Sequence, residues 1–227
     1  MKKAVFTLDV NKYAPKITRI TRPWLGHYAK KIGADLVVID KRKFPNFPPV
    51  YEKLQIHELG RGYDWSIFFD ADCLIHPDLF DITTHLNKDT VLQFSHDLAD
   101  VRFKSDIYFQ RDGRHIGCGG WLSVVSDLCL DFFKPLDDIT FEEALANISV
   151  INNEKLVEVS SDHLIDDYVT SRNLARYGLK HTTFIKIVEA LEKETQEKPY
   201  GYFAHNGALD EQKKIEFLEA KIKEWRI

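Results

Sequence analysis

The sequence has few cysteines, no long apolar run and no excess of positive charge, and each shortage excludes a class of protein. Its three cysteines are odd in number and lack close metal-type spacing, so we expect reduced thiols in a reducing compartment. No window approaches the ~18 consecutive apolar residues of a membrane-spanning helix. The formal net charge of −4 is not the basic balance that nucleic-acid-binding proteins usually carry.

The N-terminal residues also lack the pattern of a signal peptide. The start, MKKAVFTLDV, carries positive charge, but Asp9 and Lys12 interrupt its apolar run early. Repeats, low-complexity stretches and dividing linkers are missing as well. We therefore expect a cytoplasmic protein that has no transmembrane segment and does not bind nucleic acid. Peripheral contact with a membrane surface remains an alternative.

The 227 residues are enough for one α/β domain with a sizeable core. In the first part of the chain, short apolar runs alternate with segments of helical periodicity. They predict strands at 4–10, 34–40 and 64–72, and helices at 16–32 and 51–62. This β-α-β-α-β order is typical of a Rossmann-like, doubly wound sheet flanked by helices.

The rest of the chain is less regular. It predicts strands at 90–95, 115–126, 181–187 and 200–207, and helices at 127–134, 160–178 and 210–226. Pro23 is a potential kink in the first helix. The polar segment 96–113 is a candidate substrate loop, and 136–160 has no assignment.

The stretch FFDADCLIHPD, residues 68–78, ends a hydrophobic strand in a DxD motif. If the extended conformation continues, Asp70 and Asp72 project to one side and Ala71 to the other. In open α/β sheets, the carboxyl ends of strands face the ligand crevice. Two such carboxylates repel unless one is protonated or a cation lies between them, and their oxygens suit Mg²⁺ or Mn²⁺. The alternative is that Asp70 caps the next turn and Asp72 is solvated.

Residues 50–82 resemble the donor-site segment of the glycogenin-like glycosyltransferases, family 8, which have the GT-A fold. The shared features are a lysine on a helix, an aromatic-rich strand, the DxD motif, an apolar pair and a downstream Leu-Phe pair. In this chain they are Lys53, Phe68-Phe69, Asp70-Ala71-Asp72, Leu74-Ile75 and Leu79-Phe80. Residues 7–14, 160–167 and 203–214 are similar to the family's uridine, sugar and histidine motifs.

The resemblance implies a single GT-A domain over 1–227, with a nucleotide-binding half (1–95) and a half that binds sugar and acceptor (96–227). The implied metal ligands are Asp70, Asp72 and His205, and an imidazole ligand favours Mn²⁺ slightly over Mg²⁺. Residues expected to bind the donor, with UDP-sugar as the first choice, are Thr7, Asp9, Tyr13, Lys53, Asp70, Ala71, Asp97, Gly207 and Lys213. Those expected at the reaction centre are Asp162 and His163.

The implied activity is metal-dependent transfer of a sugar from a nucleotide-diphosphate sugar to a glycan, glycolipid or other hydroxyl acceptor, with retention of anomeric configuration. Inversion would need a carboxylate base near the acceptor, and the sequence does not single one out. The enzyme class is a hexosyl-type glycosyltransferase. No motif in the sequence identifies the donor sugar or the acceptor.

The sequence departs from the family pattern at three points. GCGG, residues 117–120, replaces the usual Asn-Ala-Gly, and His163 stands where glutamine is usual. The histidine motif lacks the usual proline and tryptophan after its lysine. Trp121, which follows the glycines, is expected in the core, and the alternative is a stacking platform for an acceptor.

Two other functions remain as alternatives. A nucleotidyltransferase that makes a sugar nucleotide would need a glycine-rich, arginine-containing loop after the first strand, and TLDVNKYAPK has no glycine. A non-catalytic domain that binds sugar nucleotides would keep the ligands without turnover. A metal-dependent phosphatase is disfavoured, because its DxD usually follows the first strand and this one follows the third.

Overall fold

The computed structural model describes residues 1–94, 101–103, 107–112, 120–150, 161–195, 201–206 and 209–226. Its strands are β1 (Lys3–Leu8), β2 (Ala34–Ile39), β3 (Trp65–Phe69), β4 (Leu74–Ile75), β5 (Thr90–Gln93), β6 (Val101–Phe103), β7 (Leu122–Ser126), β8 (Ile148–Val150), β9 (Lys180–Thr183) and β10 (Phe203–Ala204). Its α-helices are α1 (Pro15–Lys31), α2 (Ile56–Leu59), α3 (Ile107–Asp112), α4 (Phe141–Ala146), α5 (Ile165–Arg176), α6 (Phe184–Thr195) and α7 (Glu211–Trp225). Its 3-10 helices are η1 (Val10–Lys12), η2 (Pro49–Gln55), η3 (Ile82–His85), η4 (Asp127–Phe133) and η5 (Ser161–Leu164).

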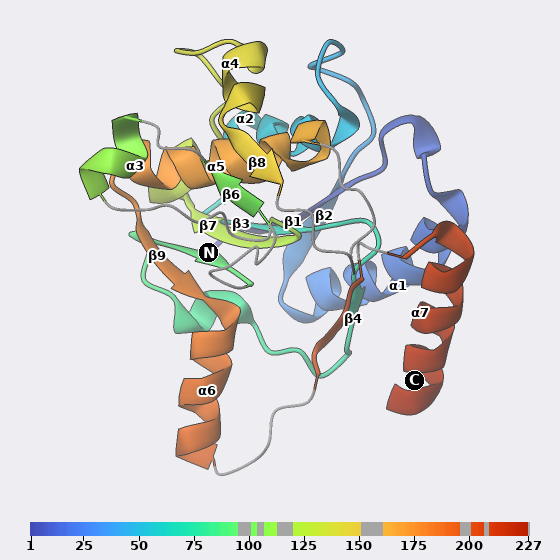
Figure 1. The fold of residues 1–227 in the computed structure, drawn as a ribbon. Helices are drawn as coiled ribbons and strands as arrows, with labels where there is room; N and C mark the ends of the chain where they lie inside the picture. The colour runs from blue at the N-terminus through green and yellow to red at the C-terminus, as the bar shows by residue number, and fades with distance from the viewer. Residues whose placement is uncertain are drawn as a thin grey trace.

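A six-stranded mixed sheet in the order β2-β1-β3-β7-β5-β9 forms the centre of the molecule (Figure 1). Strand β1 pairs in parallel with β2 and β3, and β5 pairs in parallel with β9. Strand β7 is antiparallel to both of its neighbours, β3 and β5. The predicted architecture, a doubly wound mixed sheet flanked by helices in a single domain, is confirmed.

Helices cover both faces of this sheet because its inner strands alternate buried side chains between two apolar clusters. Phe6 and Phe68 join the cluster beneath η2, η4 and α5. Val5, Ile67 and Phe69 join the cluster covered by α1 and α6. In Figure 1, α5 lies above the sheet, and α1 and α6 lie below it. The central strands are therefore apolar on both faces, as the continuous run SIFF predicts.

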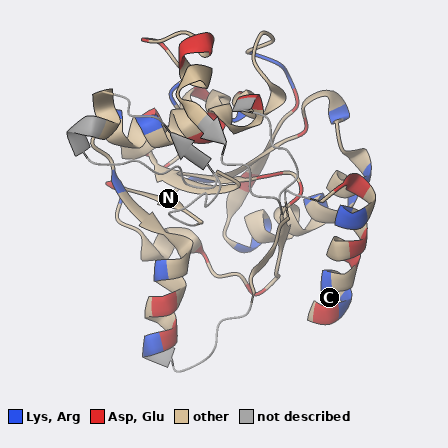
Figure 2. Ribbon diagram, in the orientation of Figure 1, with Lys and Arg blue, Asp and Glu red and all other residues tan. Residues whose placement is uncertain are grey.

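A smaller sheet attaches the C-terminal part of the chain. Strands β4 and β10 pair antiparallel, with Ala204 opposite Leu74. Helix α7 packs beside α1, where Leu218 is fully buried in a cluster with Ala14 and Ile17. Helices α6 and α7 each carry both acidic and basic residues (Figure 2). Of the helices in the described ranges, none has the length and apolar character needed to cross a membrane.

The predicted strand over 181–187 is wrong in its second half. Strand β9 ends at Thr183, and α6 begins at Phe184. The apolar residues between Phe184 and Leu191 recur at helical spacing and face the second cluster. Burial of that helical stripe overrides the β preference of the short run TTFIKI.

Other elements differ from prediction mainly in their ends. Strand β3 stops at Phe69, before the DxD motif, and the predicted helix over 51–62 is a 3-10 helix followed by one α-helical turn. Helix α1 continues through Pro23, with Thr21 and Leu25 buried on either side of it. Segment 136–160, which had no assignment, contains α4, and Thr140 caps this helix in a capping box with Glu143.

Candidate metal centre

A tight turn after β3 carries the DxD carboxylates. The N–H of Asp70 donates to the Trp121 carbonyl over 2.9 Å, and the N–H of Cys73 donates to the Asp70 carbonyl over 3.1 Å. The hydroxyl of Thr21, on α1, donates to the Ala71 carbonyl. The motif is therefore a turn and not the expected extended strand. One hydrogen bond within the turn and two to residues outside it, Trp121 and Thr21, hold it in shape.

The pairing of β4 with β10 brings His205 to this turn. Because Ala204 lies opposite Leu74 in an antiparallel pair, the next residue, His205, comes beside Cys73 and its neighbour Asp72. Nε2 of His205 lies 3.2 Å from Oδ1 of Asp72 and 3.9 Å from Oδ2 of Asp70. Residues more than 130 positions apart thus share one site.

The three predicted metal ligands meet in this structure. One ligand atom each from Asp70, Asp72 and His205 can be chosen so that all lie within 4.8 Å of one another. Their side chains are only partly exposed, at 32%, 12% and 15%. Two carboxylate oxygens and one imidazole nitrogen form a donor set that fits Mn²⁺ and also accepts Mg²⁺. The residues present therefore fit a divalent cation.

The charges around the two carboxylates are unequal. Nζ of Lys214, on the first turn of α7, lies 2.5 Å from Oδ2 of Asp72. Burial opposes ionisation of Asp72, but His205 and Lys214 outweigh it and hold the pKa of Asp72 below its usual value. Burial and the Asp72 charge raise the pKa of Asp70, although Lys53 opposes them and a third of the side chain still reaches solvent. A cation between the carboxylates would stabilise both as anions.

Lys53 lies beneath the turn and is 3% exposed. Its Nζ pairs with Asp166 on α5, lies 3.7 Å from Oδ1 of Asp70 and donates to the Gly120 carbonyl over 3.2 Å. Burial would lower the pKa of Lys53, but Asp166, Asp70 and Asp167 together raise it above its usual value. Lys53 is therefore a buried cation that joins the DxD turn to the start of α5.

Gly120 completes this buried network. Its N–H donates to Oδ1 of Asp167 over 2.8 Å. A Cβ at this position would lie 2.5 Å from that oxygen and 3.1 Å from Nζ of Lys53, so only glycine leaves room for both contacts. Burial and the charge of Asp166 raise the pKa of Asp167 well above its usual value.

The turn after β1 holds the residues expected to bind the nucleoside. Thr7 is buried on β1, and Tyr13 lies after η1 near the DxD turn. Desolvation and the charges of Asp70 and Asp72 raise the pKa of Tyr13; since the residue is 58% exposed, we attribute more of the shift to the charges. Among the described residues, Oγ1 of Thr7 and Oδ1 of Asp9 are buried and have no hydrogen-bond partner.

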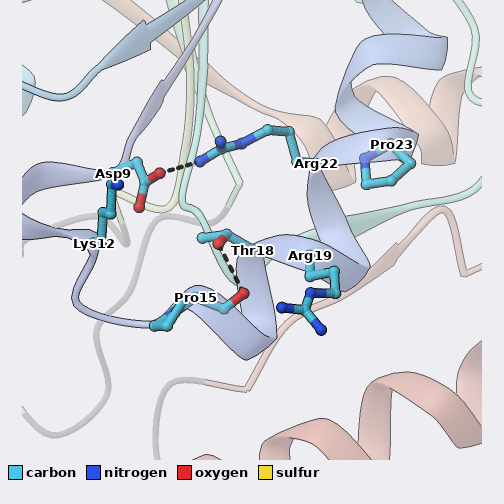
Figure 3. A pocket seen from close by; sticks show the side chains of 7 residues that line it. All are labelled: Asp9, Lys12, Pro15, Thr18, Arg19, Arg22 and Pro23. Atoms are coloured by element: carbon cyan, nitrogen blue, oxygen red, sulfur yellow. Dashed lines mark hydrogen bonds and ion pairs between the residues drawn. The ribbon is translucent and has the colours of Figure 1, made fainter.

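A pocket of about 490 Å³ opens between this turn and the outer face of α1 (Figure 3). Its lining residues are Asp9, Lys12, Pro15, Thr18, Arg19, Arg22 and Pro23. Arg22 points toward Asp9 and pairs with its Oδ2. The volume of the pocket lies within the usual range for small-molecule sites. The polar groups that line the pocket include both hydrogen-bond donors and acceptors.

The remaining predicted site residues are exposed or lie outside the described residues. Asp162 and His163, in η5, are exposed. Lys213 is 70% exposed at its side chain and pairs with Asp210, the N-cap of α7. Asp97 and Gly207 lie outside the described residues.

The structure brings four further residues to the site. Lys214 contacts Asp72, Asp166 contacts Lys53, Asp167 contacts Gly120, and Trp121 stacks on His205. The pairs KK at 213–214 and DD at 166–167 were visible in the sequence, but a choice between adjacent residues needs the exact helix start. No sequence signal placed Trp121 against a histidine 84 positions away.

The sequence matches no family model and no curated protein. Among solved structures, it resembles a glycosyltransferase involved in the glycosylation of the major capsid of PBCV-1. The TM-score is 0.54 at 11% identity, over 97% of this chain and 100% of that one. This similarity, together with the mixed six-stranded sheet and its flanking helices, shows the GT-A fold of glycosyltransferases.

Two other similar structures are galactosyltransferases. One is LgtC in complex with donor and acceptor sugar analogues, with a TM-score of 0.46 at 11% identity, over 99% of this chain and 100% of that one. The other is a Drosophila β-1,4-galactosyltransferase 7 mutant with manganese, UDP-Gal and xylobiose, with a TM-score of 0.45 at 12% identity, over 91% and 72%. Because both TM-scores are below 0.5, only the first similarity bears on the fold.

Proposed function

We propose that this chain is a metal-dependent glycosyltransferase of hexosyl type. It would move a sugar from a nucleotide-diphosphate sugar, with UDP-sugar as the first candidate, to a hydroxyl group of a glycan or glycolipid. The observation that carries the proposal is the convergence of Asp70, Asp72 and His205 at the carboxyl end of β3 in a GT-A fold. A leaving diphosphate brings negative charge that such a site can accept.

In this proposal, Asp70, Asp72 and His205 hold Mn²⁺ or Mg²⁺, which would supply Lewis-acid stabilisation to the leaving diphosphate. Lys214, on α7, pairs with Asp72. Once Asp72 binds the metal, the Lys214 ammonium group would be released to bind a phosphate oxygen of the donor. Lys213, one residue earlier, remains the alternative for this role. Lys53, 3.7 Å from Oδ1 of Asp70, opposes the burial and the Asp72 charge that raise the pKa of Asp70.

The nucleoside would bind at the turn after β1. Oγ1 of Thr7 and Oδ1 of Asp9 have no partner among the described residues, and an N–H or carbonyl of a base could pair with them after a small movement. The charges of Asp9, Asp70 and Asp72 all act on the Tyr13 hydroxyl, so a ribose or base bound at this turn would pass near Tyr13. We thus propose that residues 1–95 bind the nucleotide, while residues 96–227 supply the sugar and acceptor contacts and complete the metal shell.

We propose Asp166 as the carboxylate that meets the donor sugar. It is 3% exposed, its Oδ2 pairs with Lys53, and its Oδ1 has no partner among the described residues. A buried acceptor without a donor is costly, and a sugar hydroxyl would satisfy it. Asp162 and His163 remain candidates for contacts at the exposed side of the same segment.

Retention is the proposed stereochemistry. Asp166 is already paired with Lys53, which makes it a weak nucleophile, and attack from the leaving-group face needs no protein nucleophile. The anomeric configuration of the first product, read by proton NMR within minutes of starting the reaction, tests this. An inverted product would require a carboxylate base near the acceptor.

Calorimetry of UDP binding tests the function itself. Wild type should bind UDP in the presence of Mn²⁺ and much more weakly in the presence of a chelator. The variant D72N should lose the Mn²⁺-dependent binding, because one of three metal ligands becomes a neutral amide. The matched control D89N removes an exposed carboxylate at the start of β5 and should bind like wild type.

The other outcomes are equally informative. Binding of GDP or CDP in place of UDP would keep the function and change the base. Binding without turnover of any sugar nucleotide would favour the non-catalytic alternative, and release of pyrophosphate from a nucleoside triphosphate and a sugar phosphate would favour the nucleotidyltransferase. No nucleotide binding under any condition would overturn the proposal.

The roles of the two acidic positions before and inside α5 are separable. We expect D166N to keep Mn²⁺-dependent UDP binding and to lose most hydrolysis or transfer of the sugar. D162N, at an exposed position, should retain turnover. If D162N lost turnover and D166N kept it, the sugar contact would instead be assigned to Asp162.

A further inference from the structure

Trp121, just before β7, touches two of the three residues of the candidate metal centre. Its carbonyl accepts the N–H of Asp70 over 2.9 Å. Its indole ring stacks on the imidazole of His205, with ring centroids 4.8 Å apart and planes inclined by only 18°. A single residue thus contacts the first ligand through its backbone and the third through its side chain.

The indole ring is itself held in place by two aromatic residues. Phe94, directly after β5, lies 4.4 Å from it between centroids, and Phe203 meets it edge-on at 5.4 Å. Phe203 belongs to β10, two residues before His205. The ring is therefore packed between Phe94, directly after β5, and the small sheet that precedes His205.

His205 needs such support because its own element is short. Strand β10 has only two residues, Phe203 and Ala204, so His205 follows directly after the last paired residue. A ligating histidine is usually oriented by a hydrogen bond from its second ring nitrogen. Among the described residues, His205 has polar contacts only to Asp70 and Asp72, both through Nε2.

Stacking is a suitable substitute for that hydrogen bond. A ligating nitrogen uses a lone pair in the plane of its ring, so a partner on the ring face fixes the plane without covering the nitrogen. In the observed arrangement, Nε2 of His205 stays directed at Asp72, 3.2 Å from Oδ1.

We propose that Trp121 is a positioning residue of the metal centre, which sets the imidazole plane of His205 while its carbonyl fixes the DxD turn. This inference rests on the metal site of the proposed function. It assigns Trp121 a role in metal binding, in place of core filling alone or a platform for an acceptor. The backbone contact survives any substitution, so only the ring's contribution is tested by mutation.

The test is the affinity for Mn²⁺ alone, measured from the electron paramagnetic resonance signal of the free ion during titration. We expect W121L to weaken Mn²⁺ binding by about tenfold or more, the usual effect of removing a residue that orients a metal ligand. W121F keeps a ring on His205 and should recover most of the affinity. D72N identifies the binding as that of the triad.

W225L is the matched control. Trp225, at the end of α7, also packs its ring against a histidine, His76, with centroids 5.0 Å apart. That histidine is not part of the triad, so W225L should bind Mn²⁺ like wild type. Urea unfolding of each variant shows whether W121L and W225L are equally folded under the titration conditions.

Fluorescence supplies an independent signature. Mn²⁺ should quench part of the tryptophan emission of wild type through Trp121, and this part should be missing in W121F and present in W225L. Equal Mn²⁺ affinity of folded W121L and wild type would overturn the positioning role and leave the metal site intact. Absence of Mn²⁺ binding in wild type would instead remove the metal site, and the role of Trp121 with it.

Discussion

At the scale of single residues, the site depends on buried charges, each of which is balanced by a small number of partners. Lys53 is 3% exposed, and its ammonium group contacts Asp70, Asp166 and the Gly120 carbonyl. Burying a lysine in such a place costs free energy, and burying its carboxylate partners without the lysine would cost as much. Substitutions here should therefore affect stability as well as any activity.

We predict that K53M lowers the free energy of unfolding by about 3–5 kcal/mol, because it leaves a buried carboxylate without its cation. The double variant K53M/D166N, which removes both charges, should lose less than K53M alone. Urea denaturation measures both.

K43M is the control, since Lys43 pairs with Glu58 on the surface, where side chains are 41% and 60% exposed. Its cost should stay near the ~0–1 kcal/mol of exposed pairs. A cost for K53M no greater than that for K43M would contradict the buried network.

Gly120 gives a second prediction at this scale. In G120A, the added methyl would meet Oδ1 of Asp167 at 2.5 Å and push apart the contacts to Lys53 and Asp167. We expect a loss of about 1–3 kcal/mol, typical of overpacking. G201A, whose Cβ has no atom within 4 Å, should melt close to wild type by calorimetry. Equal melting temperatures for the two variants would argue against the close approach at Gly120.

At the scale of elements, α1 shows how much local preference and packing each contribute. Its buried face packs on the sheet, and its outer face lines the pocket beside Asp9. The helix tolerates Pro23 in its interior and contains Gly26, both of which weaken an isolated helix. Tertiary packing therefore holds this helix together more than the preferences of its residues do.

We predict that G26A stabilises the protein by roughly 1 kcal/mol, the difference in helix preference between glycine and alanine. The new methyl would have ordinary van der Waals contact with Leu36, 3.9 Å away. G33A, at the end of the same helix, should do the opposite, because Gly33 has a φ of +67° that alanine adopts with strain. Chemical denaturation of both variants checks the two signs; a gain from G33A would contradict the assignment of this helix end.

At the scale of the whole molecule, ion pairs join segments that cover the same face of the sheet. Arg172, on α5, is 2% exposed and donates two hydrogen bonds to Asp138, over 2.8 and 2.9 Å. Asp138 lies in the connection between η4 and α4. These bonds hold the pKa of Asp138 below its usual value. The pair therefore links the stability of the helical layer to pH.

Because the folded-state pKa is lowered, the stabilisation by Asp138 is complete above its unfolded pKa of ~3.9 and is lost as the pH falls below that value. We predict that D138N is less stable than wild type at pH 7 and that the difference narrows by pH 3. Unfolding free energies at the two pH values measure it. A difference that is the same at both would show that Arg172 does not depend on the charge of Asp138.

Prediction from the sequence succeeded where local pattern is enough. The run SIFF followed by DAD predicted a buried strand ending in carboxylates, and the structure has β3 and Asp70 at those positions. It failed for 181–187, where the helical stripe that begins at Phe184 was mistaken for strand. Short apolar runs do not distinguish the two structures until their burial is known.

The sequence by itself determined the mixed α/β layering, and resemblance to a family motif predicted the three residues that meet at the candidate metal centre, Asp70, Asp72 and His205. Only the tertiary structure decided that Lys214 faces Asp72 and Lys213 does not, and that Asp166 meets Lys53 while Asp162 is exposed. The physical reason for the lysines is helical phase, since adjacent residues on a helix point about 100° apart. Asp162 and Asp166 differ because they lie in separate elements, η5 and α5. The direction of each side chain is therefore set by where the helix begins and how it docks.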